Sequence, residues 1–204
     1  MKNLLMLHSL PVATETTDFR LTSDEMHNLR SKSLKNNNPE GLATVTETCF
    51  LFDDPRFNRI KEFMQDHIDD YVANILEIEN KMVLTTSWCA VNKPGSHHPK
   101  HDHKNTILSI VYYADCESGD LVLDFKNSRL EERFNFSYNI KRYNEFNSNQ
   151  WILPLRTGDI IIFPGWVDHY TQDNKSDKER IVIGANYFIR GQLGTKWDVS
   201  YLEV

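Results

Sequence analysis

The sequence predicts one mainly β domain, a β-sandwich or barrel preceded by α-helices. From Met82 onward, apolar and polar residues follow the two-residue period of strands, and turn signals such as Pro94-Gly95 and Thr157-Gly158 separate most of the runs. Strong helical periodicity occurs only before residue 80. Many short strands with few helices are typical of a sandwich or barrel, and 204 residues suit a single domain. The predicted strands are 82–91, 101–114, 119–126, 133–140, 150–156, 159–163 and 180–189.

The N-terminal part, residues 1–80, is predicted to hold an early strand within 1–20 and two helices. Thr22 or Ser23 suits the N-cap of the first helix, which the Asn-Asn-Asn-Pro run ending at Pro39 stops. Asp54 is a good N-cap for the second, with Pro55 in its first turn. Its expected buried face is Phe57, Ile60, Met64, Ile68, Tyr71 and Ile75.

Composition sets limits on function and location. The net charge of −6 argues against a general nucleic-acid binder, although it does not exclude a local basic groove. Three cysteines without CxxC spacing (Cys49, Cys89 and Cys116) are expected to be reduced, buried thiols. No run approaches the roughly 18 apolar residues of a membrane helix, and the first residues make a poor signal peptide. We therefore expect a cytoplasmic protein. The apolar tail 190–204 suits docking against the body or a second copy.

The segment HHPKHDHK, residues 97–104, concentrates histidine, the commonest metal ligand. In an extended strand His101 and His103 share one face and Asp102 points the other way. His169 follows a buried strand, where it can supply a third ligand from a distant part of the chain. A single histidine is more often structural, but these three predict a metal site with open positions. The flanking His97, His98 and Lys100 suit a solvated entrance loop or a patch that steers an anionic substrate.

Arg180 opens the otherwise apolar strand RIVIGANYFI. A buried arginine needs an anionic partner because an unpaired buried charge is costly. The planar guanidinium suits a carboxylate. That carboxylate belongs either to a ligand or to an Asp or Glu of the chain.

Several motifs, in order, resemble those of the 2-oxoglutarate- and Fe(II)-dependent oxygenases, in particular small members from bacteria and phages. The segment HDHKNTILSIVYY corresponds to the metal-binding strand of that family. Other correspondences are a Ser-Gly-x-Leu strand, a Gly-Asp-(apolar)-Phe-Pro-x-Trp-x-x-His segment and an Arg-Ile-x-Ile-x-x-Asn strand. The matching residues are Ser87, Trp88, Gly95, His101, His103, Leu108, Ser109, Val111, Tyr112, Tyr113, Ser118, Gly119, Leu121, Gly158, Asp159, Phe163, Pro164, Trp166, His169, Arg180, Ile181, Ile183 and Asn186.

The resemblance implies a double-stranded β-helix, the cupin-like jelly roll, over residues 82–189. It makes His101, His103 and His169 ligands of Fe(II), with Arg180 holding the distal carboxylate of 2-oxoglutarate. It further implies cosubstrate contacts from Ser109, Tyr113 and Asn186 and a substrate pocket walled by Trp88 and Trp166. The implied activity is hydroxylation of an unidentified small-molecule or peptidyl substrate, with release of succinate and CO2.

The chain departs from the family pattern at three positions. His103 occupies the usual carboxylate position, although a bulge could turn Asp102 inward as the ligand instead. Val182 replaces a serine and Ala90 replaces an asparagine. Three neutral histidines would also suit Zn²⁺, so the metal is open. The alternatives are a three-histidine dioxygenase or hydrolase that does not use 2-oxoglutarate, and a non-enzymatic jelly-roll binding module. The polar, aromatic-rich insertion 126–150 suits a lid, a substrate-contacting hairpin or a plain solvated hairpin.

Overall fold

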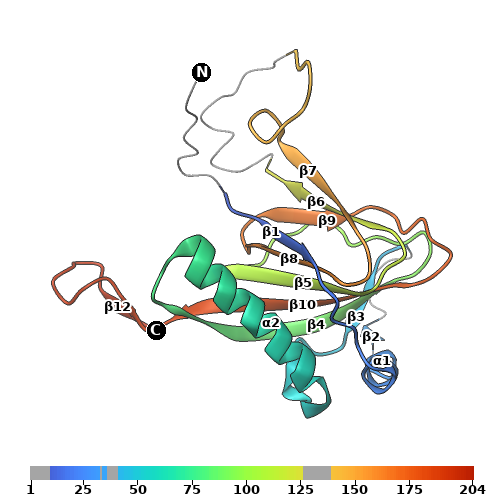
Figure 1. Cartoon of the computed structure of the whole chain (residues 1–204), viewed down its shortest axis with the longest axis horizontal. Coiled ribbons are helices and arrows are strands. Elements are labelled where there is room, and N and C mark those ends of the chain that lie inside the picture. The colour runs from blue at the N-terminus through green and yellow to red at the C-terminus, as the bar shows by residue number, and fades with distance from the viewer. Residues whose placement is uncertain (1–9, 33, 36–40, 126–138) are drawn as a thin grey trace.

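The computed structural model describes residues 10–32, 34–35, 41–125 and 139–204 (Figure 1). Its two main sheets are antiparallel, with strand orders β1-β8-β5-β10-β4-β3-β2 and β7-β6-β9, so the predicted mainly β jelly-roll class is confirmed. The strands are β1 (Ala13–Thr16), β2 (Leu34–Lys35), β3 (Thr44–Thr46), β4 (Lys81–Asn92), β5 (Leu108–Asp115), β6 (Gly119–Asp124), β7 (Gln150–Leu155), β8 (Asp159–Pro164), β9 (Asp168–Thr171) and β10 (Arg180–Arg190).

Two predicted strands need correction. The run 101–114 is a strand only from Leu108, because Asn105 has a positive φ of 55° and turns the chain before it. His101 forms only an isolated bridge, so the argument from strand alternation across His101 and His103 was wrong in detail. In the predicted strand 133–140, residues 133–138 lie outside the described part, and 139–140 are not strand. The sequence reading also missed the short strands β2, β3 and β9.

Both predicted helices are present. Thr22 caps α1 (Ser23–Arg30) through a capping box with Glu25, in which each side chain binds the other residue's backbone N–H. Asp54 caps a 3-10 turn, Pro55–Phe57, that leads into α2 (Asn58–Tyr71). The helix ends in a π-turn, Val72–Leu76, which shifts the face that each residue presents. Ile75 is therefore 54% exposed, contrary to the prediction, whereas the rest of the expected apolar face is buried.

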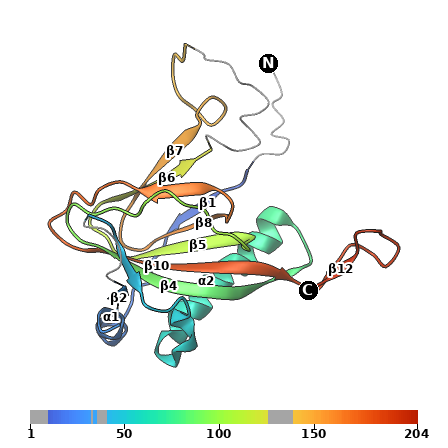
Figure 2. The ribbon, with the colours of Figure 1, turned by 180° about the vertical axis from the view of Figure 1, so that it is seen from behind.

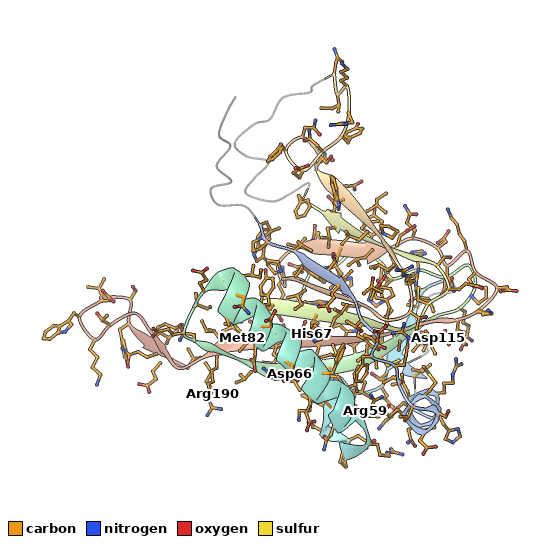
Figure 3. All side chains as sticks on the ribbon, viewed as in Figure 1. Arg59, Asp66, His67, Met82, Asp115 and Arg190 are labelled. Carbon is orange, nitrogen blue, oxygen red and sulfur yellow. The ribbon has the colours of Figure 1, made fainter. Side chains whose placement is uncertain are left out.

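The seven-stranded sheet has a core on each face. Helix α2 covers one face, where Ile60, Met64 and Ile68 pack against apolar residues of β4, β5, β8 and β10 (Figures 1 and 2). Arg59 of α2 forms an ion pair with Glu25 of α1, and Figure 3 shows Arg59 and His67 along the helix. A second core, which includes Tyr113, Leu121 and Phe163, lies between the large sheet and β7-β6-β9. The candidate site also lies on this second face, where Phe163 of the core contacts His169.

The C-terminal segment extends away from the body. Strands β11 (Gln192–Leu193) and β12 (Leu202–Glu203) form a small hairpin beyond β10 (Figures 1 and 2). Trp197 in this hairpin is 96% exposed, so it is not docked against the body of this chain. Cys89 and Cys116 are buried free thiols, but Cys49 is exposed, contrary to the prediction. No helix in the described ranges is long and apolar enough to cross a membrane.

Candidate metal and cosubstrate site

Backbone pairing brings two of the three predicted metal ligands together. His101 and His169 exchange both backbone hydrogen bonds, with N···O distances of 3.0 and 2.8 Å. The backbone N–H of His103 donates to the carbonyl of Gly165 at 2.8 Å, which anchors the loop to the β8–β9 turn. Potential ligand atoms of the three side chains all lie within 4.8 Å of one another. The loop and β9 therefore present three imidazoles to one point.

The hydrogen bonds behind these rings determine their tautomers. The Nδ1 atom of His101 lies 2.8 Å from the carbonyl of Pro99, and that of His169 lies 2.9 Å from the carbonyl of Val167. A carbonyl can only accept, so each Nδ1 carries the proton and each Nε2 keeps a lone pair. For His103, Nδ1 lies 2.7 Å from Ser109 Oγ, whose hydroxyl donates to Asn186 Oδ1 at 2.9 Å. Ser109 therefore accepts from His103, which again leaves Nε2 free.

The spacing and charge of this cluster fit a divalent metal ion. The Nε2 atoms of His101 and His103 are 3.2 Å apart. Two nitrogens each about 2.1 Å from one ion lie about 3.0 Å apart at a right angle and about 3.4 Å apart at a tetrahedral angle. Burial lowers the pKa of His103 to about 4 and that of His169 well below its usual range, so both rings are neutral at neutral pH. The Nε2 lone pairs of neighbouring rings repel each other because no proton lies between them. A bound cation would stabilise this arrangement.

Asp102, the alternative ligand, lies outside this cluster. Its carboxylate pairs with Lys104, which lowers the pKa of Asp102, and it does not belong to the group of converging side chains. Of the residues in the described ranges, His103 therefore stands at the third corner. This donor set adds no negative charge, so a bound divalent ion would keep its full +2.

Arg180 lies on the same side of the large sheet and is 98% buried. Its Nη2 donates to Thr171 Oγ1 at 2.9 Å and to the carbonyl of Gln172 at 3.1 Å, while its buried Nε has no hydrogen-bond partner. Within the described residues, no carboxylate forms an ion pair with this guanidinium. A Cβ on Gly119 would lie 3.1 Å from Arg180 Cδ, so the absence of a side chain at residue 119 makes room for the arginine. A buried cation with a free N–H fits an anionic ligand.

Residues 86–186 match the protein family described as "Putative 2OG-Fe(II) oxygenase". The chain belongs to the 2-oxoglutarate- and Fe(II)-dependent oxygenase superfamily. Fe(II) and 2-oxoglutarate are the metal and cosubstrate of this superfamily. No curated protein matches the sequence.

Solved structures support the fold of this oxygenase. HygX from Streptomyces hygroscopicus, solved with nickel and 2-oxoglutarate bound, is 12% identical with a TM-score of 0.60, covering 87% of this chain and 82% of HygX. The epimerase SnoN from nogalamycin biosynthesis is 11% identical with a TM-score of 0.59, covering 86% and 75%. A prolyl-4-hydroxylase from Pseudomonas putida is 12% identical with a TM-score of 0.55, covering 90% and 95%.

The other residues predicted to contact the cosubstrate, Ser109, Asn186 and Tyr113, lie in different surroundings. Ser109 and Asn186 stand behind His103, and Asn186 Nδ2 also donates to Thr86 Oγ1 at 3.1 Å. Their hydrogen bonds orient the imidazole of His103, and the contact of Ser109 and Asn186 with the cosubstrate stays a prediction. Tyr113 is 99% buried. Burial raises the pKa of Tyr113, so the hydroxyl remains a donor.

The two tryptophans predicted to wall the substrate pocket have unequal surroundings. Trp88 packs across Gly184, where a Cβ would come within 2.5 Å of its ring, and lies perpendicular to His103 with ring centroids 5.2 Å apart. Trp88 therefore lies beside the histidine cluster, and its role as a wall of the substrate pocket stays a prediction. Trp166 is 49% exposed and follows Gly165, the residue that anchors His103. Trp166 is therefore half open to solvent, and its place in the substrate pocket stays a prediction.

Three residues beside the cluster were not recognised from the sequence. His98 was assigned to a solvated loop, but its ring is partly buried, 4.7 Å from that of His101. In the same loop, the exposed Lys100 pairs with Asp124 and Asp168, and the half-buried His97 pairs with Asp173. Thr171 and Asn92, both beside Arg180, carried no motif of their own. The histidine run was a usable signal for His98, whereas the other two depend on strand register.

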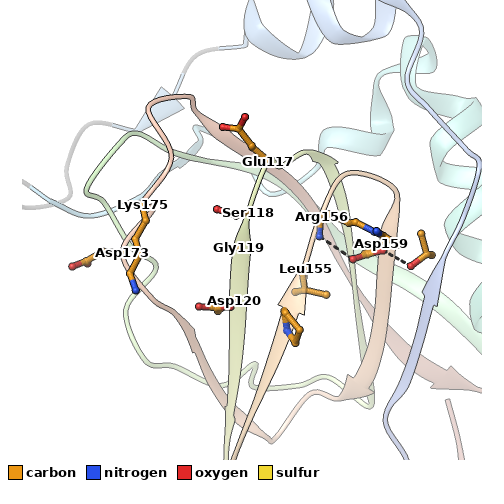
Figure 4. A pocket seen from close by; sticks show the side chains of 11 residues that line it. Glu117, Ser118, Gly119, Asp120, Leu155, Arg156, Asp159, Asp173 and Lys175 are labelled. Carbon is orange, nitrogen blue, oxygen red and sulfur yellow. Dashed lines mark hydrogen bonds between the residues drawn. The ribbon is translucent and has the colours of Figure 1, made fainter.

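A separate open pocket of about 430 Å³ lies at the other end of β6 from His169 (Figure 4). Its lining includes Gly119, where an added Cβ would meet the side chain of Arg180. The carboxylate of Asp159 in this pocket accepts hydrogen bonds from the Thr16 hydroxyl and the Arg156 backbone N–H. That carboxylate is already engaged in joining β1 and β8. None of the three clustered histidines lines the pocket, so it is distinct from the histidine site.

The metal-free oxygenase is expected to lose stability as the pH falls below 6.5. Burial lowers the pKa of His98 to about 3 and that of His103 to about 4, and it also lowers that of His169. The unfolded chain binds these protons near the ordinary value of 6.5, so it holds more protons than the folded state between pH 6.5 and 4. The free energy of unfolding should therefore fall by about 1.4 kcal/mol per pH unit for each such ring over this range, and these rings should add no further change well above pH 6.5.

Urea unfolding in chelator at pH 7, 6 and 5 measures this slope. His103→Gln should reduce it by the contribution of one ring, whereas the exposed His27→Gln should not change it. A stability that is flat from pH 7 to 5 would contradict the expectation.

Proposed function

We propose that the protein is an Fe(II)- and 2-oxoglutarate-dependent dioxygenase that hydroxylates a small-molecule or peptidyl substrate and releases succinate and CO2. The observation that carries the proposal is a pair of sites on one side of the large sheet. Three neutral imidazoles converge at one place, and a buried guanidinium without a carboxylate partner in the described residues lies at the other. A dicarboxylate with a metal-binding keto acid end satisfies both.

Strand geometry supports this spacing. Thr171, which contacts Arg180, stands two residues beyond His169 on β9. Two residues of a strand span about 6.6 Å, which is close to the length of a five-carbon dicarboxylate. His101, His103 and His169 would hold the metal, and Arg180 would hold the distal carboxylate by charge-assisted hydrogen bonds. Trp88 and Phe163, which contact His103 and His169, would limit the access of water.

Bound Fe(II) with 2-oxoglutarate supplies the oxidation of an unactivated C–H bond by dioxygen. The chain supplies orientation: the hydrogen bonds at each Nδ1 fix the rings, and Arg180 fixes the far end of the cosubstrate. Similar folds occur in an epimerase, SnoN, and in a prolyl-4-hydroxylase. Hydroxylation is proposed here because it is the reaction of the latter and needs no group beyond those named. A three-histidine enzyme without 2-oxoglutarate is the second candidate. It would provide no anionic partner for Arg180, which has no carboxylate partner among the described residues.

Anaerobic titration tests the proposal. Adding Fe(II) and then 2-oxoglutarate to the protein should produce a visible charge-transfer band that saturates with the cosubstrate. Exposure to oxygen should then release succinate, slowly without substrate and faster with the correct one. Absence of the band at saturating 2-oxoglutarate, with Fe(II) bound, would favour the second candidate.

A further inference from the structure

Residues 191–204, the arm, carry apolar side chains that no described part of this chain covers. Trp197 is 96% exposed and Val199 is fully exposed, while Leu202 and Val204 are each half exposed. Figures 1 and 2 show the arm leading away from both main sheets and from α2. Single apolar residues on a surface are ordinary, whereas a group of them on one projecting segment marks an interaction site.

The arm is a formed hairpin although it has no core of its own. Gly191 and Val204 exchange both backbone hydrogen bonds, at 2.9 and 3.1 Å, and β11 pairs with β12. The side-chain amide of Asn80 donates to the carbonyl of Gln192 at 2.9 Å, which holds the base of the arm against the loop before β4. An isolated two-stranded hairpin is marginally stable at best in water, and packing against another surface stabilises it. The arm therefore has a defined direction and lacks a packing partner among the described residues.

An open groove of about 460 Å³, apolar over most of its surface, lies beside the base of the arm. The end of α2, the π-turn and the first residues of β4 line it, and so does Asn80, which binds the arm. Ala73 of the π-turn and Ile78 are exposed in this lining. Met82, another lining residue, and Arg190, the last residue before the arm, lie at the same end of the molecule in Figure 3.

The charges of the arm and the groove are complementary. Lys196, beside Trp197 in the loop of the hairpin, is exposed and forms no ion pair with any described residue. The groove lining has two carboxylates, Asp69 and Glu79, against one base, Lys81, so its net charge is negative. Opposite charges around an apolar contact bring two surfaces together and select the correct partner. The groove therefore suits the arm in both its apolar and its charged character.

A second copy of this chain provides a groove that the projecting arm can enter. Because the arm and the groove adjoin in each copy, two copies related by a two-fold axis can exchange their arms. We propose that the protein is a homodimer in which the arm of each copy docks into the groove of the other, with Trp197 as the anchor. The arm and the groove lining make up roughly 25 residues of each copy, within the about 20 to 30 residues per side of a stable interface.

Sedimentation velocity over about a 100-fold range of protein concentration tests the proposal. The wild type should sediment as a dimer at the upper end of this range. A buried tryptophan anchor contributes at least about 30-fold to affinity, and a two-fold dimer uses it twice, so Trp197→Ala should weaken dimerisation about 1,000-fold. Because this side chain is exposed in the single chain, the variant should match the wild type in circular dichroism. The matched control is Tyr143→Ala, which removes another exposed aromatic ring, from the segment before β7, and should leave the dimer unchanged.

A second variant shows which surfaces meet. Ala73→Arg places a long side chain in the groove and leaves the arm intact, so it should also be a monomer. Mixing Ala73→Arg with Trp197→Ala should restore dimers, because the mixed pair keeps one intact arm opposite one intact groove. Its affinity should lie about 30-fold below that of the wild type, compared with about 1,000-fold for Trp197→Ala alone.

The outcomes that would overturn the proposal also identify other occupants of the groove. Acrylamide quenching of Trp197 is measured as the difference between the wild type and Trp197→Ala. A wild-type monomer with Trp197 fully quenched would mean that the arm binds a different partner. A monomer with Trp197 shielded would mean that the arm folds onto its own groove. A dimer that both Trp197→Ala and Ala73→Arg leave intact would be formed by another surface.

Discussion

Replacing His169 with alanine is expected to abolish Fe(II) binding. His169 is the buried member of the cluster and the one supplied by β9, opposite His101. Removing it leaves two imidazoles on one loop and an apolar gap where the third donor stood. The loss in affinity should exceed the roughly 10- to 100-fold that loss of an outer hydrogen-bond partner costs a metal site. Titration of the metal-free protein with Fe(II) under anaerobic conditions measures it.

The matched control for this variant is His27→Ala. It also removes one histidine, but from the exposed side of α1, and it should bind Fe(II) like the wild type. Circular dichroism checks that both variants are folded. Wild-type Fe(II) affinity in His169→Ala would mean that the imidazoles do not form the metal site.

Replacing Arg180 with methionine is expected to have two opposite effects. Affinity for 2-oxoglutarate should fall more than about 100-fold, because the charge and the free Nε–H are both lost. The free energy of unfolding of the metal-free protein should rise by about 1–3 kcal/mol, because a buried charge that has no counter-ion among the described residues is removed and the apolar stem is kept. Calorimetric titration measures the first effect and urea unfolding the second.

Arg190→Gln is the control for this pair of effects. Arg190 lies at the exposed far end of the same strand (Figure 3), and its loss should alter neither quantity appreciably. A large fall in the stability of Arg180→Met would show that the guanidinium is structural. The proposed cosubstrate role would then lose its main support.

Much of the fold follows from local pattern, because it depends on neighbouring residues alone. Thr22 and Asp54 mark helix starts through contacts within their own first turns, and runs such as Ile160–Phe163 are apolar on both sides because both faces are covered. The same reasoning fails at Asn105. Its left-handed backbone conformation breaks the strand that the alternating pattern predicted from residue 101 onward. Ile75 fails for a similar reason, because a π-turn changes the period.

The candidate site was predicted in part, and the missing part is non-local. His101, His103 and His169 were named from spacing and resemblance, yet they converge through a backbone bridge and a contact with Gly165 that no spacing reveals. Asn92 is opposite Arg180 only because of the β4–β10 register. Thr171 contacts Arg180 from β9, and four residues are too few for an alternating apolar–polar pattern to reveal a strand. Residues of this kind become visible only when the sheets are assembled.

The four-residue strand β9 carries both an imidazole of the cluster and the hydroxyl that contacts Arg180. We expect a ligand that holds this strand in place for one contact to hold it in place for the other as well. The free energies of the two binding events are then linked: the factor by which metal tightens cosubstrate binding must equal the factor by which cosubstrate tightens metal binding. We therefore expect metal and cosubstrate to load cooperatively, because both contacts stand on one short segment.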